Sequence, residues 1–196
     1  MKLPGSCLAI LLLLVVVARA AESVPQIKAK TEEPVIEEML GGCSLRCSFQ
    51  WTVEAQPGAG GKMQPTTILN DESAQTAWVA PEPTTGVGAK FRLSFPDKIP
   101  AEMEGQTPFY GLDLINGFWK TEELWKEHAR IKKVRLYYNR KPFRDVAFVD
   151  SRRWQRVTWP DIMIRSGDSL TVEVLEIYPG TKAGLAVTEL VLEGAH

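Results

Sequence analysis

Apolar and polar residues alternate along several short segments after residue 65, and this pattern constrains the fold most. Phe91, Leu93 and Phe95 are separated by polar residues, for example. The segments that share the pattern are 90–95, 112–114, 133–138, 170–174 and 190–192, with further candidates at 146–149 and 156–159. A period of two turns one face of a strand toward the core, as in antiparallel sheets. About eight such strands with turn residues between them predict an all-β sandwich.

Two local departures from the alternation are expected. Thr121 followed by Glu122 and Glu123 predicts a short helix over 121–128, with Thr121 as its N-cap. Val174 and Leu175 place two apolar residues side by side in a strand pattern, which predicts a β-bulge.

The first twenty residues have the layout of a secretory signal peptide. Lys2 precedes an apolar run over 8–17, and Ala18-Arg19-Ala20 offers a cleavage site between small residues. The apolar run is too short to span a bilayer, and no later segment is long and apolar enough to do so. We therefore expect residues 1–20 to be removed from an exported protein, periplasmic or extracellular, that does not span the membrane.

Residues 21–64 are interpreted as an acidic lead-in. Pro34 and the residues up to Leu40 could open a short helix, and a disordered tether is the alternative. Glycines in the stretch 57–61 predict a flexible linker, so the main domain is expected to cover 65–196.

Cys43 and Cys47 remain in the chain after the signal peptide is removed. A close pair of cysteines in an oxidising compartment predicts a disulfide, which would fix a local turn. A redox or metal role is the weaker alternative, because the spacing is not C-x-x-C and two ligands do not complete a zinc site.

The sequence lacks the motifs of the common enzyme classes. It has only two histidines, one of them the terminal His196, and it contains no nucleophile elbow, zincin, P-loop or dinucleotide motif. The adjacent carboxylates at the start of the expected helix are explained by the helix dipole. We therefore expect a non-catalytic protein with no catalytic residues.

The stretch from Lys126 to Arg156 holds eleven basic and three acidic residues. One interpretation is that the outward positions of strands must be polar and are basic here by chance. The other is a surface that attracts polyanions, such as an acidic glycan, an anionic envelope polymer or the chain's own Glu-rich lead-in. Nucleic acid is disfavoured by export and by the acidic balance of the whole chain.

Aromatic residues near the expected helix give a second indication of binding. Trp119 and Trp125 flank or lie within this segment. Tryptophan can present a flat apolar face to a sugar while polar side chains bind its hydroxyls. The alternative is burial in the core, which we expect for three or four of the six tryptophans.

Several strings resemble a known family. Residues 69–78 (LNDESAQTAW) resemble the D-G-D-x-x-T-x-W loop of discoidin-like domains, also called coagulation factor V/VIII type C domains. Residues 86–93, 111–121, 130–134 and 177–190 resemble later motifs, and are most similar to the bacterial branch named for the translocation region of NAD glycohydrolase toxins. The resemblance covers 65–194 and implies an eight-stranded jelly roll with a carbohydrate-binding role, without NAD hydrolysis.

Relatives of this fold often hold a structural calcium ion in that loop. The resemblance implies Asp71, Thr76 and Glu189 as calcium ligands, but Glu72 and Ser73 replace the family's Gly and second Asp. Calcium favours several oxygen ligands, carboxylates among them. The loss of one carboxylate leaves open the alternative that Asp71 only caps the turn.

Two functions from different classes follow. The first is a glycan-binding module that uses Trp119, Trp125, Arg130 and Asn139 near the rim of the sandwich, with a glycan or cell-envelope polymer as partner. The second is an envelope protein–protein interaction module that uses the same sandwich.

Overall fold

The computed structural model describes residues 23–31, 45, 50–58, 60–182 and 184–195. The expected signal peptide, the expected helix after Pro34, and Cys43 with Cys47 lie outside these residues. No helix among the described residues is long and apolar enough to cross a membrane.

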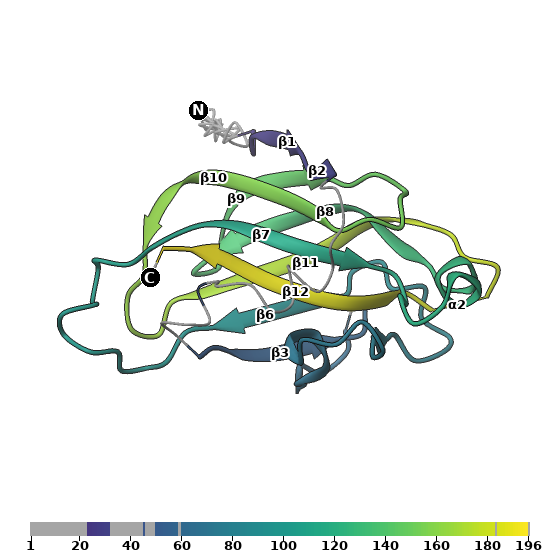
Figure 1. Cartoon of the computed structure of the whole chain (residues 1–196), viewed down its shortest axis with the longest axis horizontal. Coiled ribbons are helices and arrows are strands. Elements are labelled where there is room, and N and C mark those ends of the chain that lie inside the picture. Colours follow the sequence, from purple (N-terminus) through teal and green to yellow (C-terminus); the bar gives the residue numbers. More distant parts are fainter. Residues whose placement is uncertain (1–22, 32–44, 46–49, 59, 183, 196) are drawn as a thin grey trace, which may run out of the picture.

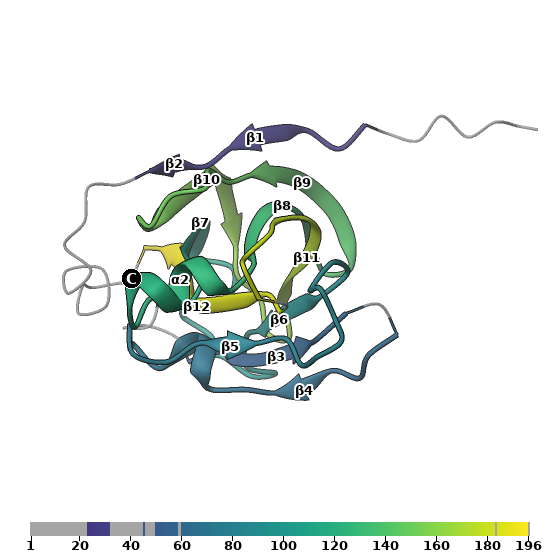
Figure 2. The same cartoon turned by 90° about the vertical axis from the view of Figure 1, so that its right-hand side faces the viewer.

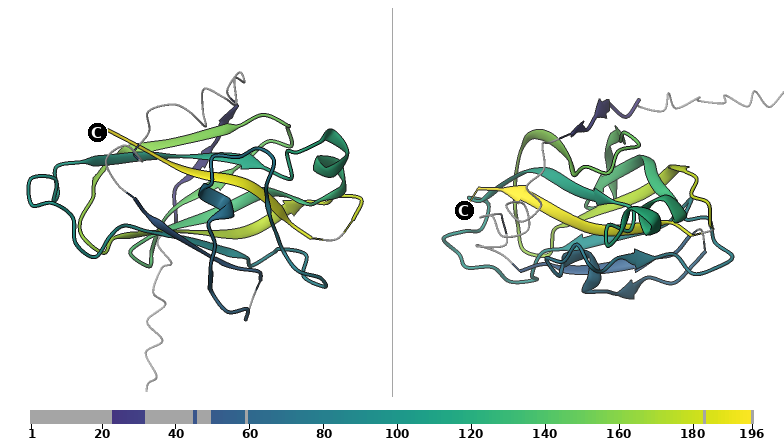
Figure 3. Two further views of the ribbon diagram at one scale, coloured as in Figure 1. Left: turned by 60° about the horizontal axis from the view of Figure 1, so that its bottom comes forward. Right: turned by 45° about the vertical axis from the view of Figure 1, so that its right-hand side comes forward.

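Two β-sheets pack face to face (Figures 1 and 3). The seven-stranded sheet has the order β1 (Gln26–Lys28), β9 (Lys141–Ala147), β8 (Arg130–Tyr138), β11 (Ser169–Tyr178), β6 (Lys90–Ser94), β3 (Thr52–Gln56) and β4 (Gln64–Pro65). The five-stranded sheet has the order β2 (Lys30–Thr31), β10 (Gln155–Met163), β7 (Pro108–Asn116), β12 (Ala186–Gly194) and β5 (Trp78–Val79). This arrangement confirms the predicted antiparallel β-sandwich. The structure also has short edge strands that were not predicted, and one of them, β1, pairs with β9 in parallel.

The core lies between the sheets and is built by the alternating residues of the strands. Phe91 and Leu93 of β6 pair with Val172 and Leu170 of β11, and all four are buried. An aromatic cluster fills one end, where the Phe109 ring centre lies 5.1 Å from that of Trp159. Alternation therefore predicted the inward face of these strands correctly.

The helix and the bulge are also confirmed. Helix α2 (Glu122–Glu127) begins after Thr121, whose hydroxyl accepts a hydrogen bond from the Leu124 N–H at 3.2 Å. The register between β11 and β8 shifts between Val174 and Glu176, so the adjacent apolar residues do coincide with a bulge. A short 3₁₀ turn, η2 (Ile68–Asn70), precedes the Asp71 loop.

The sandwich begins earlier than the boundary expected at residue 65. β3 pairs with β6 over five residues, and Trp51 and Val53 belong to the core. Residues 57–61, expected to be a linker, instead connect β3 to β4, and the Gly61 N–H donates to the Gly58 carbonyl at 3.1 Å. Glycines suit a tight turn as well as a linker, and composition alone does not separate the two.

Part of the acidic lead-in crosses the edge of the sandwich as a strap, which we define as residues 23–31. β1 pairs in parallel with β9 of one sheet, and β2 pairs antiparallel with β10 of the other. Figure 2 shows this strap lying across β9 and β10. The strap therefore covers edges of both sheets, where unpaired backbone groups would otherwise be exposed.

Candidate functional site

Three of the four residues expected to bind a glycan meet beside α2. The indole N–H groups of Trp119 and Trp125 both donate to the carbonyl oxygen of Asn116, at 3.0 and 2.9 Å. The Arg130 guanidinium lies 4.4 Å from the centre of the Trp125 ring and makes two hydrogen bonds to Asp150, at 2.9 and 2.8 Å. Trp119 and Arg130 are only 5% and 7% exposed.

The backbone beneath this cluster is tightly packed. The Asn116 side chain accepts from the Ile131 N–H at 2.8 Å and donates to the Ile131 carbonyl at 2.7 Å, which joins β7 to β8. Gly117 has φ +88°, and a Cβ there would lie 2.6 Å from the Trp125 ring. Trp119, Trp125 and Arg130 therefore hold strands together, and one face of the Trp125 ring is covered by Arg130.

Asn139, the fourth expected residue, lies at the opposite end of β8. Arg130 is the first residue of β8 and Asn139 follows its last residue, so the two are roughly 30 Å apart at the rise of a strand. Its amide donates to Asp168 at 2.6 Å and accepts from the Ser169 N–H at 2.9 Å. The four residues expected at one rim therefore belong to two ends of the sandwich.

The structure brings together the residues implied for calcium. The Thr76 hydroxyl donates to Asp71 at 2.7 Å, and the Ser73 N–H donates to Asp71 at 3.0 Å and to Glu189 at 3.2 Å. The Ser73 N–H, which donates to both Asp71 and Glu189, occupies the position that a bridging cation would take. Within the described residues, no group of three or more His, Cys, Asp or Glu side chains is arranged to hold a metal ion. Two carboxylates and one hydroxyl, already engaged with one another or with the Ser73 N–H, do not fit calcium, which takes about six to eight oxygen ligands.

We expect the melting temperature to be the same in millimolar calcium and in excess chelator. Replacing Glu189 by glutamine should lower it in both buffers alike, because a neutral amide oxygen is a weaker acceptor for the Ser73 N–H than the buried carboxylate. Thermal unfolding of both proteins in both buffers measures this. A calcium-dependent rise in the parent protein that disappears in the variant would mean that the loop does bind the ion.

Most of the basic stretch is neutralised by carboxylates on neighbouring strands and on the helix. The pairs are Lys126 with Glu122, Arg130 with Asp150, Lys132 with Glu176, Lys133 and Arg135 with Asp145, and Arg156 with Asp113. Arg135 and Asp145 share two hydrogen bonds, and Arg135 is the main cause of the lowered pKa of Asp145. Arg140 and Lys141 are exposed and form no ion pair within the described part of the chain. The turn between β8 and β9 therefore carries two adjacent cations of this stretch without an ion pair among the described residues.

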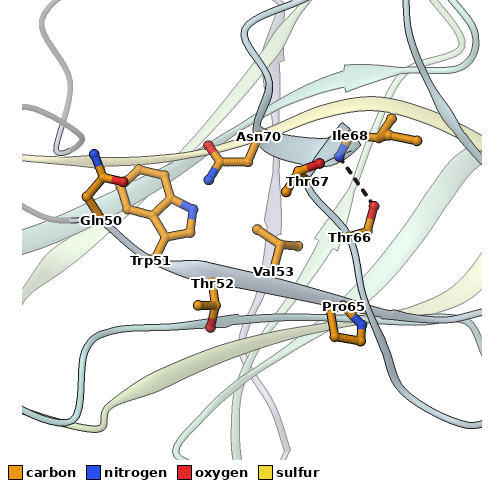
Figure 4. Close-up of a pocket in the computed structure, with 9 residues that line it drawn as sticks. All are labelled: Gln50, Trp51, Thr52, Val53, Pro65, Thr66, Thr67, Ile68 and Asn70. Atoms are coloured by element: carbon orange, nitrogen blue, oxygen red, sulfur yellow. Dashed lines mark hydrogen bonds between the residues drawn. The ribbon is translucent and has the colours of Figure 1, made fainter.

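A groove of about 660 Å³ lies between β3 and the segment that carries β4 and η2 (Figure 4). A hydrogen bond of 2.9 Å from the Thr66 N–H to the Val53 carbonyl ties its two walls together. We call it the Trp51 groove; its lining is Gln50, Trp51, Thr52, Val53, Pro65, Thr66, Thr67, Ile68 and Asn70. This lining combines an apolar floor with neutral amides and hydroxyls.

The side-chain amide of Asn70 is a polar group of this groove that lacks a hydrogen bond within the described part of the chain. Its carbonyl oxygen is buried and has no hydrogen-bond partner among the described residues. In Figure 4 the side chains of Gln50, Trp51 and Asn70 gather at one end of the groove. A buried acceptor without a donor costs about 1–3 kcal/mol, which a ligand hydroxyl could recover.

A second, more polar cleft of about 510 Å³ lies at the β8–β9 turn. We call it the Arg140 cleft; its lining is Arg92, Ser94, Phe95, Asp97, Asn139, Arg140, Gly167, Asp168 and Ser169. Thr52 of the Trp51 groove is the register partner of Ser94 in this cleft. Because partners on adjacent strands lie about 5 Å apart, the groove and the cleft are neighbours.

Residues 52–193 match the profile of the family described as NAD glycohydrolase translocation F5/8 type C domain. The chain belongs to this family. Its members are discoidin-like domains, so the resemblance noted in the sequence is confirmed and the family is not a catalytic one. The match begins at the first residue of β3, in agreement with the place of β3 in the sandwich.

Solved structures show the same fold at low sequence identity. The CBM32-1 and CBM32-2 domains of Clostridium perfringens ZmpB, in complex with GalNAc, match with a TM-score of 0.54 and 12% identity over 89% of this chain and 41% of that one. The same domains with the M60 catalytic domain match with a TM-score of 0.55 and 8% identity over 91% and 17%. This chain therefore spans less than half of those structures. A search of curated proteins found no match.

Sequence reasoning missed the residues of the Trp51 groove. Gln50 and Trp51 fell within the expected lead-in, and Asn70 was noted only as part of the family loop. A signal was present, because Trp51, Val53 and Ala55 alternate with polar residues as in the later strands. The glycine-rich turn that follows was taken as a linker, and it concealed this strand.

Proposed function

We propose that this protein is an exported, non-catalytic module that binds an acidic glycan across the Trp51 groove and the Arg140 cleft. Export is supported by the composition of residues 1–20. A binding role agrees with the discoidin-like fold, whose relatives include carbohydrate-binding modules.

The observation that carries the proposal is the lining of the Trp51 groove. Sugar rings have apolar faces and a rim of hydroxyls, so they bind where an apolar surface adjoins a few polar anchors. Pro65 and Ile68, which are exposed, supply the accessible apolar surface above the buried Trp51 and Val53. The amides of Gln50 and Asn70 supply neutral anchors. No charged side chain lines this groove among the described residues.

The acidic part of the ligand is assigned to the Arg140 cleft. Arg140 is held in place by the β8–β9 turn, where it has φ +68° beside Asn139 with φ +48°. Arg140 forms no ion pair among the described residues, although Asp97 and Asp168 also line the cleft. A glycan that places a neutral unit in the groove would bring a neighbouring uronate, sialate or sulfate to this arginine. Asn139 then contributes by holding the turn through Asp168.

Glycan-array binding of the mature chain tests the proposal. We expect acidic glycans to bind, Asn70→Ala to weaken binding about tenfold through loss of an amide anchor, and Arg140→Gln to weaken acidic glycans selectively. Gln75→Ala and Lys141→Gln are the matched controls, since Gln75 and Lys141 are exposed and line neither pocket. Silent arrays together with one stoichiometric partner recovered from exported proteins would instead favour a protein-interaction module.

A further inference from the structure

The strap leaves a third cleft, of about 370 Å³, between itself and β10. Its lining is Ile27, Lys28 and Lys30 from the strap, with Arg156 and Thr158 from β10. Arg156 and Thr158 are two residues apart on one strand and therefore share its outward face. Three cations and one hydroxyl, from two segments that are far apart in the sequence, thus meet in a single cleft.

The strap lysines bring charge that no described residue neutralises through an ion pair. Lys28 and Lys30 are exposed and form no ion pair with any described residue. Ala29 between them is buried, and its N–H donates to the Ala147 carbonyl at 3.0 Å. This hydrogen bond fixes the strap between the two lysines, so that both are positioned at the cleft.

Arg156 is held rigidly at the floor of the cleft. Its guanidinium makes two hydrogen bonds to the Asp113 carboxylate, at 2.8 and 2.7 Å, and lies 4.8 Å from the centre of the Trp154 ring. Asp113 is fully buried. A cation whose orientation is already fixed loses little conformational entropy when a ligand binds.

Glu193 of β12 lies 3.3 Å from Arg156 and is the second carboxyl group here. Burial, and secondarily the Asp113 carboxylate, raises the pKa of Glu193 to about 8. The charged groups that face Glu193 among the described residues are Asp113 on β7 and Arg156 on β10. The raised pKa favours the neutral form of Glu193 near pH 7, which leaves Asp113 as the charged carboxyl group beside Arg156 among the described residues.

We infer that this cleft binds a tetrahedral oxyanion, sulfate or phosphate, either free or carried as a substituent on a larger molecule. Such an anion presents several acceptor oxygens, and the two ammonium groups, the guanidinium and the Thr158 hydroxyl supply donors from different sides. The site is separate from the Trp51 groove, because β1 and the β3–β4 pair lie at opposite edges of the seven-stranded sheet. It does not depend on the proposed glycan function. A bound anion would link the strap to the sandwich.

Titration with sodium sulfate, followed by amide chemical shifts of the mature chain at constant ionic strength, tests the inference. We expect saturable shifts at residues 27–30 and 156–158 with a millimolar dissociation constant. Lys28→Gln/Lys30→Gln should weaken binding about tenfold, whereas Lys98→Gln/Lys141→Gln, which removes two exposed cations elsewhere, should leave it unchanged. The two double variants lower the net charge of the protein by the same amount, so a general electrostatic effect on sulfate binding would appear in both.

Two further arms complete the test. Sulfate keeps its charge above neutrality, so its affinity should fall several-fold from about pH 6.5 to about pH 9 as Glu193 ionises, and Glu193→Gln should remove this fall. Comparing inorganic sulfate with galactose 6-sulfate distinguishes a free anion from one carried on a larger molecule. Tighter binding of the sugar ester identifies a carried substituent, and equal binding identifies a free ion. The inference is overturned by an absence of saturable shifts at the strap, or by equal binding in the two double variants.

Discussion

Asn116→Ala is expected to lower the free energy of unfolding by roughly 2–5 kcal/mol. The side chain is 1% exposed and satisfies both the N–H and the carbonyl of Ile131. Alanine would leave both backbone groups buried without a partner, at about 1–3 kcal/mol each. Urea unfolding followed by tryptophan fluorescence measures the change.

Asn116→Ala should also loosen the packing beside α2. The Asn116 carbonyl accepts both indole N–H groups of Trp119 and Trp125, so a shift of β7 would loosen both rings. Gln75→Ala is the matched control, because Gln75 is exposed and its loss should cost less than about 0.5 kcal/mol. A loss below about 1 kcal/mol in Asn116→Ala would contradict the structural role assigned to this cluster.

Arg156→Ala is expected to lower the free energy of unfolding by roughly 3–5 kcal/mol. Removing one partner of a buried ion pair leaves an uncompensated charge, here the carboxylate of Asp113, which has no exposed surface. Chemical unfolding of the variant at neutral pH is the measurement.

A second ion pair between strands provides the comparison. Arg92 and Glu54 are 43% and 32% exposed and lie 3.3 Å apart, so Arg92→Ala should cost less than about 1 kcal/mol. Replacing both members of the buried pair, as Arg156→Met/Asp113→Leu, should recover most of the stability lost in the single variant. Equal losses in Arg156→Ala and Arg92→Ala would show that burial of Asp113 does not set the cost.

The sandwich could be predicted because burial between two sheets imposes a period of two on the sequence. The pattern identified the inward faces of β6, β8 and β11, where one side is in the core and the other in water. It was less informative for β7, where Asp113 alternates with Leu112 and Leu114 and yet is fully buried. A residue that is buried on the outward face of a sheet cannot be distinguished by alternation from an exposed one.

The strap and the candidate site depend on partners that sequence reasoning does not reveal. Ile27 and Ala29 alternate with polar residues, but β1 and β2 are only three and two residues long, and their pairing is set by the edges of β9 and β10. The charge of the basic stretch is cancelled by carboxylates on other strands, such as Glu176 and Asp113. A single sequence shows which side chains can pair, whereas only the register of the strands shows which of them do.

The positions of the tryptophans also depend on partners that the sequence does not reveal. Trp51, Trp119 and Trp159 are buried, in line with the expectation of three or four core tryptophans. Trp119 and Trp125 were assigned to a glycan because they flank a helix, but their N–H groups are bound by a carbonyl three and nine residues earlier in the chain. Trp51 lines the larger groove because β3 passes beside η2, a contact that requires the folded chain.

A crystal structure of the mature chain soaked with mixed acidic oligosaccharides and calcium tests the central claim most directly. We expect a sugar ring between Trp51 and Asn70, an acidic group at Arg140, and no metal ion at Asp71 and Glu189. Sugar bound beside Trp125 with an empty Trp51 groove would contradict it, as would a calcium ion held by Asp71 and Glu189.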